Sequence, residues 1–314
     1  MIGMTEILAL PVLELLLVSL LCGGVGALAL LDEKIFFAES VTHGTFPGAV
    51  LGVVVAAGLG AGHAALSVAL LSGALLLCLP LGALMRGLER LPGISSQAAA
   101  GIVLSSGFAL GYVLAKWCAP LPIRIEGFLT GSLLTVDAVD VALAGAGCLA
   151  LGLVLVARGR AVLHRAFDPV DFAAAGGNAR RTEGMLIALV VAAVVLSIPA
   201  VGTVLSIALL AAPAAGLAPR MRSLRVFLLA APIAAVLIGF AGLSVALALD
   251  LSVGGTIGIA SGLFYAGCRL LPRRIGRAAP TSSIARAPMP HERTKANERV
   301  GVRGRTEVTR AGGQ

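Results

Sequence analysis

The stretch LALPVLELLLVSLLCGGVGALALL, residues 8–31, decides the fold class. Its one charged residue is Glu14, and its length exceeds the ~20 apolar residues that an α-helix needs to cross a bilayer. It is too long for the core of a signal peptide, and an acidic residue, Glu6, precedes it where a signal peptide would carry basic ones. The stretch therefore predicts a permanent transmembrane helix.

The composition extends this prediction to most of the chain. Of its 314 residues 58% are hydrophobic and only 13% are charged, whereas about a quarter of the residues of a soluble protein are charged. The five cysteines are scattered singly, so neither a disulfide framework nor a zinc ribbon is indicated. The composition predicts a protein embedded in the lipid bilayer.

Apolar runs recur along the chain. They cover residues 8–31, 45–61, 63–84, 96–116, 136–157, 184–198, 201–218, 226–248 and 253–271. Pro199 either separates two helices of a hairpin or only kinks one helix, so the runs predict nine helices or eight. We expect an all-α, polytopic transmembrane helix bundle.

The loops between these runs differ in basic charge, which indicates the orientation because cytoplasmic loops are enriched in Lys and Arg. Alternate loops hold eleven such residues: Lys34, Arg86, Arg90, Arg158, Arg160, Arg165, Arg180, Arg181, Arg220, Arg222 and Arg225. The opposite loops hold only Lys116 and Arg124. The first set is predicted to be cytoplasmic, with the C-terminus inside and, for nine helices, the N-terminus outside.

The C-terminal segment, residues 273–314, differs from the rest of the chain. It has ten Arg or Lys residues against three Glu, which supplies seven of the net charge of +8. With so few large apolar residues it cannot bury a core, so residues 1–272 are predicted to form the membrane domain and 273–314 a disordered cytoplasmic tail. The tail serves as a topology anchor or rests on anionic lipid. Because the positive charge is not spread over the fold, no nucleic-acid partner is predicted.

The longest predicted cytoplasmic loop, residues 158–183, carries signals for a short helix. Asp168 suits the cap position and Pro169 the first turn, and Gly176 with Gly177 suits the end. Such a helix either docks a partner protein or is an amphipathic connector. By the same capping logic, Asp137, Asp140 and Asp250 at helix ends are predicted to be structural.

Glu39 and His43 lie where the chain enters the second apolar run, just before residue 45. Four residues apart, they share one helix face and could offer an oxygen and a nitrogen ligand to Zn(II), Mn(II) or Fe(II). Ser40 and Thr42 add hydroxyls that could orient them. Spacing alone favours the simpler interpretation that the carboxylate and the imidazole satisfy each other.

Four landmarks in order resemble the permease subunit of the bacterial zinc, manganese and iron uptake ABC transporters. Residues 39–48, ESVTHGTFPG, resemble that family's D-A-x-S-H-A-x-x-P-G stretch, and residues 166–176, AFDPVDFAAAG, resemble its F-D-P-E-x-A-x-x-x-G loop. VGTVL at 201–205 with LAAPAA at 210–215 is similar to its V-G-x-x-L and L-x-x-P-A-A helix, and residues 250–256 to its closing D-x-P-x-G turn. The landmarks span most of residues 8–271.

The resemblance implies a multi-pass permease of the bacterial plasma membrane that works with cytoplasmic ABC ATPase subunits, an extracellular metal-binding protein and a second permease chain. It places Glu39 and His43 on the path of a transported divalent metal, with no permanently bound cofactor. It also places Phe167, Asp168, Pro169, Phe172 and Gly176 in the helix that couples to the ATPase.

The sequence departs from that family at two of these landmarks and leaves alternatives open. Glu39 stands in place of an Asp and Ser252 in place of a Pro, so the metal, and whether the cargo is a metal, are open. The chain has no G-x-x-x-x-G-K-[ST] loop and is predicted not to be an enzyme; ATP would be hydrolysed by a partner. A secondary transporter or channel is the alternative, and a membrane-embedded enzyme ranks last.

Overall fold

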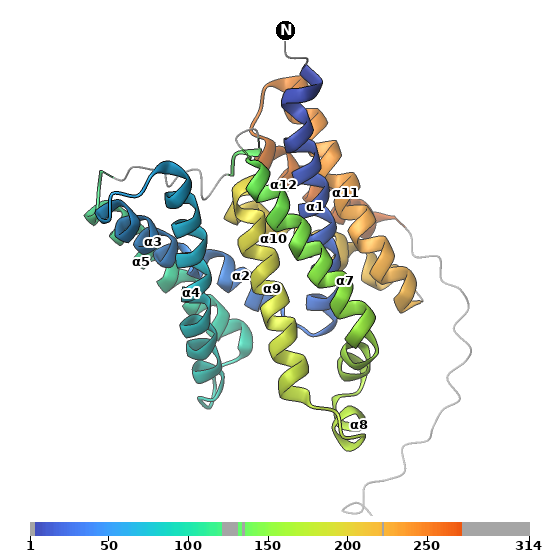
Figure 1. Cartoon of the computed structure of the whole chain (residues 1–314). Helices are drawn as coiled ribbons and strands as arrows, with labels where there is room; N and C mark the ends of the chain where they lie inside the picture. Colours follow the sequence, from blue (N-terminus) through green and yellow to red (C-terminus); the bar gives the residue numbers. More distant parts are fainter. Residues whose placement is uncertain (1–3, 121–130, 134–135, 222, 272–314) are drawn as a thin grey trace, which may run out of the picture. The chain divides into compact units, whose positions relative to one another are not determined.

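The computed structural model describes residues 4–120, 131–133, 136–221 and 223–271 (Figure 1). The predicted tail, residues 273–314, and the basic residues Arg124 and Arg222 lie outside these described residues. Regular structure in the described part is helical, with α-helices and short 3₁₀ turns, so the all-α prediction is confirmed there.

The described helices follow one another along the chain. Their bounds are α1 Met4–Leu31, α2 Ile35–Gly44, α3 Phe46–Gly58, α4 His63–Glu89, α5 Ser96–Trp117, α7 Ala138–Phe167, α8 Pro169–Ala174, α9 Ala179–Val201, α10 Thr203–Leu217, α11 Leu224–Leu249 and α12 Val253–Leu270. A 3₁₀ turn, η2, covers Ala218–Arg220.

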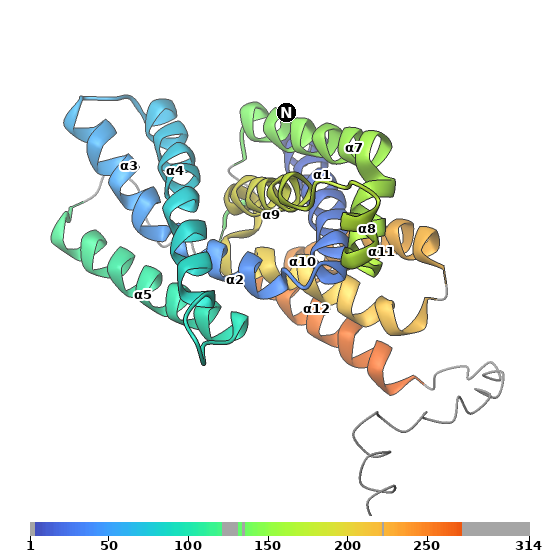
Figure 2. The same cartoon turned by 90° about the horizontal axis from the view of Figure 1, so that it is seen from below.

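The helices of residues 4–271 pack in two groups joined by α2 (Figure 2). In the larger group α1 packs against α7, α9, α10 and α11, and α12 packs against α10 and α11. In the smaller group α3 packs against α4 and α5. The short helix α2 packs mainly on α5 and also contacts α9 and α10, so it lies where the two groups meet.

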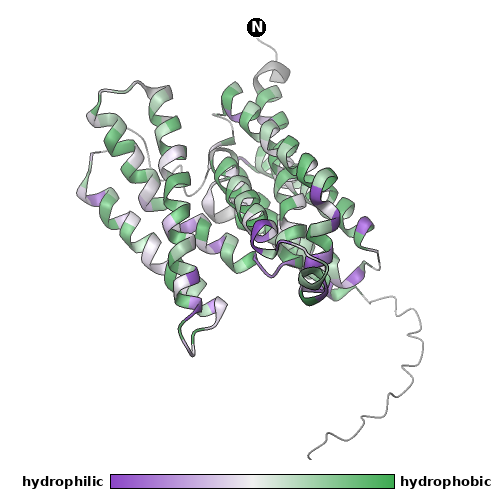
Figure 3. Ribbon diagram, turned by 60° about the horizontal axis from the view of Figure 1, so that its bottom comes forward, coloured by the Kyte–Doolittle hydropathy of each residue, from purple (hydrophilic) through white to green (hydrophobic). Residues whose placement is uncertain are grey.

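Among the residues that the structure describes, seven segments are long and apolar enough to span a membrane: Leu8–Leu31, Ile35–Gly58, Val68–Glu89, Ser96–Trp117, Ala138–Phe167, Ala179–Ile198 and Leu224–Leu249. Apolar side chains also face outward. On α7, for example, Leu149, Leu153 and Val156 are more than two-thirds exposed at helical spacing, as a lipid-facing surface requires. Figure 3 shows the helix shafts as hydrophobic and gathers much of the hydrophilic colour at helix ends.

The second apolar segment starts earlier than residue 45, the predicted start. Its helix begins at Ile35 and is interrupted once, at Thr45, which separates α2 from α3. Lys34, Glu39 and His43 lower the hydropathy of residues 34–44. For this reason the apolar runs alone did not indicate that the helix starts at Ile35. Glu39 and His43 consequently lie within the spanning segment, one turn before its break.

The segment around Pro199 forms two helices. The break falls at Gly202, which has φ of +82°, a conformation that glycine adopts without steric cost. Ser197 Oγ lies 2.7 Å from Ser206 Oγ, although residues nine apart in a continuous helix would be about 13.5 Å apart along the axis. The chain therefore bends sharply at Gly202 and does not continue as one kinked helix. With α2 and α3 counted together and the short α8 left out, the described residues hold nine helical segments, seven of which meet the length and hydropathy of a membrane span.

Three of the predicted cytoplasmic loops meet at one end of residues 4–271. Lys34 from the α1–α2 loop forms an ion pair with Glu183 of α9, and both line a small pocket with Arg86 and Glu89 of α4. Arg165 at the end of α7 also reaches the α1–α2 loop. We call this end, which carries Lys34, Arg86, Arg165 and α8, the basic end.

The caps agree with two of the three expectations. Asp137 and Asp140 form a reciprocal capping box at the start of α7, in which the backbone N–H of Asp137 donates to Asp140 at 3.0 Å. Asp250 is structural as predicted, but it does not cap the start of α12 as the capping logic implied. This residue ends α11 with φ of +53°, and Ser252 caps α12 instead. In both cases the role is structural.

Candidate functional site: a metal path on α2 and a docking helix

Glu39 and His43 lie one turn apart on α2 and both are half-buried. The imidazole of His43 meets the ring of Phe108 edge to face, with centroids 6.0 Å apart. Phe108 in turn stacks on Phe46, at the start of α3, with a centroid distance of 5.8 Å. The aromatic pair fixes one side of the imidazole at the break between α2 and α3.

The two side chains do not satisfy each other. In the described part of the chain no hydrogen bond or ion pair joins Glu39 to His43, and neither side chain has another such partner. A carboxylate and an imidazole inside a spanning segment are costly without partners. Their oxygen and nitrogen atoms are therefore available to a cation.

The neighbouring hydroxyls do not orient this pair, so that expectation is wrong. Ser40 Oγ contacts the backbone carbonyls of Phe36 at 2.8 Å and of Ala100 at 2.9 Å. Thr42 Oγ1 donates to the carbonyl of Ala38 at 2.6 Å. These hydroxyls instead satisfy backbone groups, and the Ser40–Ala100 contact ties α2 to α5.

A pair of glycines brings α2 and α5 into close contact. A Cβ on Gly107 would lie 2.7 Å from the Cα of Gly44, and small residues allow such helix packing in membranes. The Ser40–Ala100 and Gly44–Gly107 contacts follow one face of α2. Glu39 and His43 lie on the adjacent face, so the packing fixes the direction in which they point.

We expect Gly107→Val to destabilise the protein by about 1–3 kcal/mol, because overpacking at this contact forces α2 away from α5. Thermal unfolding of the purified protein in detergent measures the effect. Gly101→Val is the matched control, since no atom lies within 4 Å of a Cβ at Gly101 of the same helix. Equal melting temperatures for the two variants would contradict the close packing.

The number of ligands limits what this site can hold. No group of three His, Cys, Asp or Glu residues with metal-site geometry occurs among the residues the structure describes. Glu39 and His43 supply two ligands, whereas structural zinc sites use four. The pair suits a cation that keeps other ligands, such as water, while it passes.

A second buried carboxyl lies on α1. Glu14 is fully buried, and neither of its carboxylate oxygens has a hydrogen-bond partner in the described residues. Its side chain lies inside the larger helix group, where α1 packs against α7, and Asp140 is a neighbouring charge. The sequence left open whether Glu14 faces a pore or another helix, and the structure places it against helices.

The helix α8 forms as the loop sequence predicted. Asp168 accepts hydrogen bonds from the backbone N–H groups of Val170 at 3.1 Å and Asp171 at 2.8 Å, with Pro169 at the first position. Gly176 follows with φ of +79°. The end of α7 is held to α8 because His164 Nε2 lies 2.8 Å from Asp171 Oδ2.

The two phenylalanines of this segment have different roles. Phe172 is buried, contacts the ring of His164 with a centroid distance of 5.6 Å, and packs against Gly177. Phe167 is 68% exposed, and Val170, which the sequence did not single out, is 78% exposed. Phe172 therefore holds α8 in place, whereas Phe167 at the end of α7 and Val170 in α8 expose apolar side chains.

We expect Asp168→Ala to remove about 1 kcal/mol from the stability of α8, since an N-cap side chain satisfies otherwise free N–H groups. Amide hydrogen exchange in residues 169–174 should become about fivefold faster. Asp168→Asn keeps a capping oxygen and is the control. Equal exchange in the alanine and asparagine variants would show that the cap does not support α8.

The comparisons with known proteins agree with this geometry. The model of the ABC 3 transport family matches residues 4–269. The chain belongs to the ABC 3 transport family. This confirms the family resemblance seen in the sequence, and the match covers both the α2 pair and α8.

Individual relatives cover most of this ABC 3 chain. It is 32% identical to the zinc transport system membrane protein TroC of Treponema pallidum, over 74% of the chain and 76% of the relative. It is 25% identical to the manganese transport system membrane protein MntC of Halalkalibacterium halodurans, over 80% and 82%. In fold it is similar to the solved structure of PsaBC from Streptococcus pneumoniae in complex with Fab, with a TM-score of 0.74, 21% identity, and coverage of 86% and 93%.

The sequence did not predict one group of residues at the basic end. Asp32, Lys34, Arg165 and Glu183 lie together there, although Asp32 and Arg165 are 133 positions apart. Each residue alone is an ordinary charged residue of a predicted cytoplasmic loop. No local pattern could have paired them.

Proposed function

We propose that this chain is the permease subunit of an ATP-driven importer for a divalent transition metal, with zinc or manganese as the first candidates and iron as the third. The observation that carries the proposal is the free Glu39–His43 pair inside a spanning segment of an ABC 3 family chain. Imidazole and carboxylate are common ligands of these metals. The metals named for TroC and MntC support the choice.

In this proposal the path runs beside α2. A metal delivered by an extracellular binding protein enters where α2 meets α3 and is held briefly by His43 and Glu39. Two protein ligands bind it weakly enough for release. The protein lies in the bacterial plasma membrane and pairs with a second permease chain, and its own residues carry out no catalysis.

The basic end faces the cytoplasm in this proposal, and the C-terminus lies inside. The positive-inside rule supports this orientation because the loops with most Lys and Arg meet at that end. The exposed pair Phe167 and Val170 then meets a cytoplasmic ATPase subunit, which supplies the energy. Exposed apolar residues on a solvated loop are typical of a protein contact.

Metal accumulation in cells tests the proposal. Cells that express the permease with its ATPase should accumulate zinc or manganese, and replacing the P-loop lysine of that ATPase should reduce accumulation to background. Uptake that continues on an ion gradient without ATP hydrolysis would instead support a secondary transporter or channel. Absence of uptake of any of the three metals in the intact system would contradict the metal cargo.

A further inference from the structure

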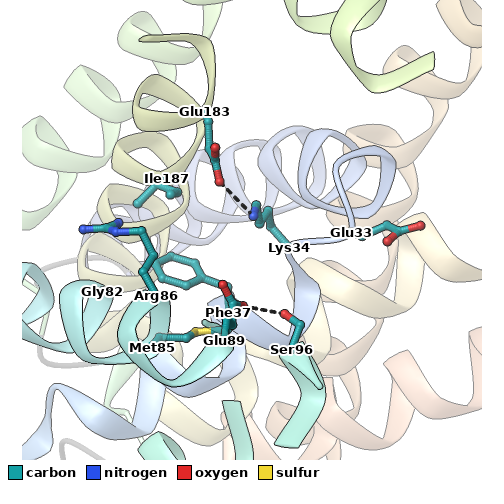
Figure 4. Close-up of a pocket in the computed structure, with 10 residues that line it drawn as sticks. All are labelled: Glu33, Lys34, Phe37, Gly82, Met85, Arg86, Glu89, Ser96, Glu183 and Ile187. Atoms are coloured by element: carbon teal, nitrogen blue, oxygen red, sulfur yellow. Dashed lines mark hydrogen bonds and ion pairs between the residues drawn. The ribbon is translucent and has the colours of Figure 1, made fainter. Parts of the chain in front are cut away.

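Four alternating charges at the basic end form a continuous chain between α7 and α2. Arg165 Nη1 lies 2.6 Å from Asp32 Oδ1, and Arg165 Nη2 lies 3.7 Å from Glu183 Oε2. Glu183 Oε1 lies 3.1 Å from Lys34 Nζ, the contact drawn in Figure 4. The order is therefore Asp32, Arg165, Glu183 and Lys34.

The inner pair of this chain is shielded from water. The side chains of Arg165 and Asp32 are 13% and 7% exposed, whereas those of Lys34 and Glu183 are 26% and 37% exposed. Removing one partner of a buried ion pair leaves an uncompensated charge, which is much more costly than breaking an exposed pair. The Asp32–Arg165 pair is thus the firm link, and Lys34–Glu183 the weaker one.

The four-charge chain joins the residues on both sides of α8 to the start of α2. Arg165 lies three residues before Asp168, which caps α8, and Glu183 lies near the start of α9, which follows α8. Asp32 and Lys34 belong to the loop before α2, and the backbone carbonyl of Lys34 accepts from the N–H of Ala38 in the first turn of that helix. A displacement of α8 therefore acts directly on this loop.

The helix α2 is a short unit that would move together with α5, to which the Ser40–Ala100 and Gly44–Gly107 contacts tie it. Its ten residues span about 15 Å, and it is separated from α3 at Thr45. A small pocket lined by Lys34, Phe37, Arg86 and Glu183 lies beside its start, as Figure 4 shows. A pull on Lys34 would thus shift Glu39 and His43 on the same helix.

We propose that the Asp32–Arg165–Glu183–Lys34 chain transmits movement of α8 to α2, and so couples ATP hydrolysis to opening of the metal path. The four side chains are positioning residues that touch neither metal nor ATPase. This role rests on the proposed function. It predicts that a variant that breaks these ion pairs uncouples ATP hydrolysis from metal transport, while the metal and the ATPase still bind.

The test measures metal moved per ATP hydrolysed by the permease reconstituted in liposomes with its ATPase, using Zn²⁺ and Mn²⁺ in turn. Asp32→Asn should lower this ratio about fivefold or more, the range of ordinary coupling energies, while hydrolysis continues. The conservative variant Asp32→Glu keeps a carboxylate for Arg165, which also pairs with Glu183, and should retain most of the ratio. If Asp32→Asn does not yield folded protein, Lys34→Gln breaks the exposed pair and should lower the ratio less strongly.

Arg220→Gln is the matched control. Arg220 donates to the carbonyls of Cys268 and Leu271 and so ties η2 to the end of α12, without contact to the four-charge chain. The amount of metal moved per ATP hydrolysed should be the same in Arg220→Gln as in the wild type. An unchanged ratio in Asp32→Asn, including one in which uptake and hydrolysis fall in parallel, or an equally low ratio in Asp32→Glu, would overturn the coupling role alone. A wild-type complex that hydrolyses ATP but moves neither metal would contradict the proposed function, and the coupling role with it.

Discussion

His43→Ala is expected to reduce metal accumulation about tenfold or more, the lower end of the loss seen when a group that supports metal binding is removed. The reason is that the imidazole has no hydrogen-bond partner in the described residues and is therefore free to bind the cargo. Glu39→Ala should cause a loss of the same order. Mass spectrometry of the metal content of cells that express each variant measures both losses.

Two further variants separate a ligand role from a packing role. Glu39→Asp keeps a carboxylate one methylene shorter and should retain most of the uptake, whereas Glu39→Gln should not. Glu33→Gln removes an exposed carboxylate from the loop before α2 and is the matched control, with uptake expected to stay at the wild-type value. Normal uptake in both His43→Ala and Glu39→Ala would return the pair to a structural role.

The double variant Phe167→Arg with Val170→Arg is expected to abolish stable association with the ATPase. Both side chains are exposed and apolar at the tip of the α7–α8 corner, and charges there would have to be buried in the interface. Losing such anchor residues costs about 2 kcal/mol or more, a weakening of about thirtyfold. Co-purification of the ATPase with the tagged permease measures the change.

Leu91→Arg provides the comparison for that experiment. Leu91 is 51% exposed in the loop between α4 and α5, and Arg90 beside it belongs to the same set of basic loops. It adds one positive charge, half that of the double variant, without touching α8, so co-purification should remain. Retention of the ATPase by the Phe167–Val170 variant would show that α8 is only a connector.

Sequence alone predicted the features that depend on local chemistry. Asp168, Pro169 and Gly176 stand within one short helix, so cap, first turn and end could be identified from their order. Pro199 left a hairpin or a kink open, and the helix breaks at Gly202, which meets the need for a positive φ. The start of α2 was missed because its polar residues interrupt the apolar pattern.

Features that depend on distant residues could not be predicted. Phe167 and Phe172 are equivalent in the sequence, and only the fold of α8 against His164 and Gly177 buries one of them. Ser40 and Thr42 were expected to orient the ligand pair, yet the backbone carbonyls nearby take both hydroxyls. The family resemblance identified Glu39 and His43, whereas their lack of hydrogen-bond partners became visible only in three dimensions.

The most direct test of metal transport along α2 is metal accumulation in liposomes that contain the permease and its ATPase. We expect ATP to raise the internal Zn²⁺ or Mn²⁺ of wild-type liposomes well above an ATP-free sample. The double variant Glu39→Ala with His43→Ala should hydrolyse ATP yet stay at the ATP-free value. Wild-type accumulation without ATP, or accumulation at the wild-type rate by the double variant, would contradict the account.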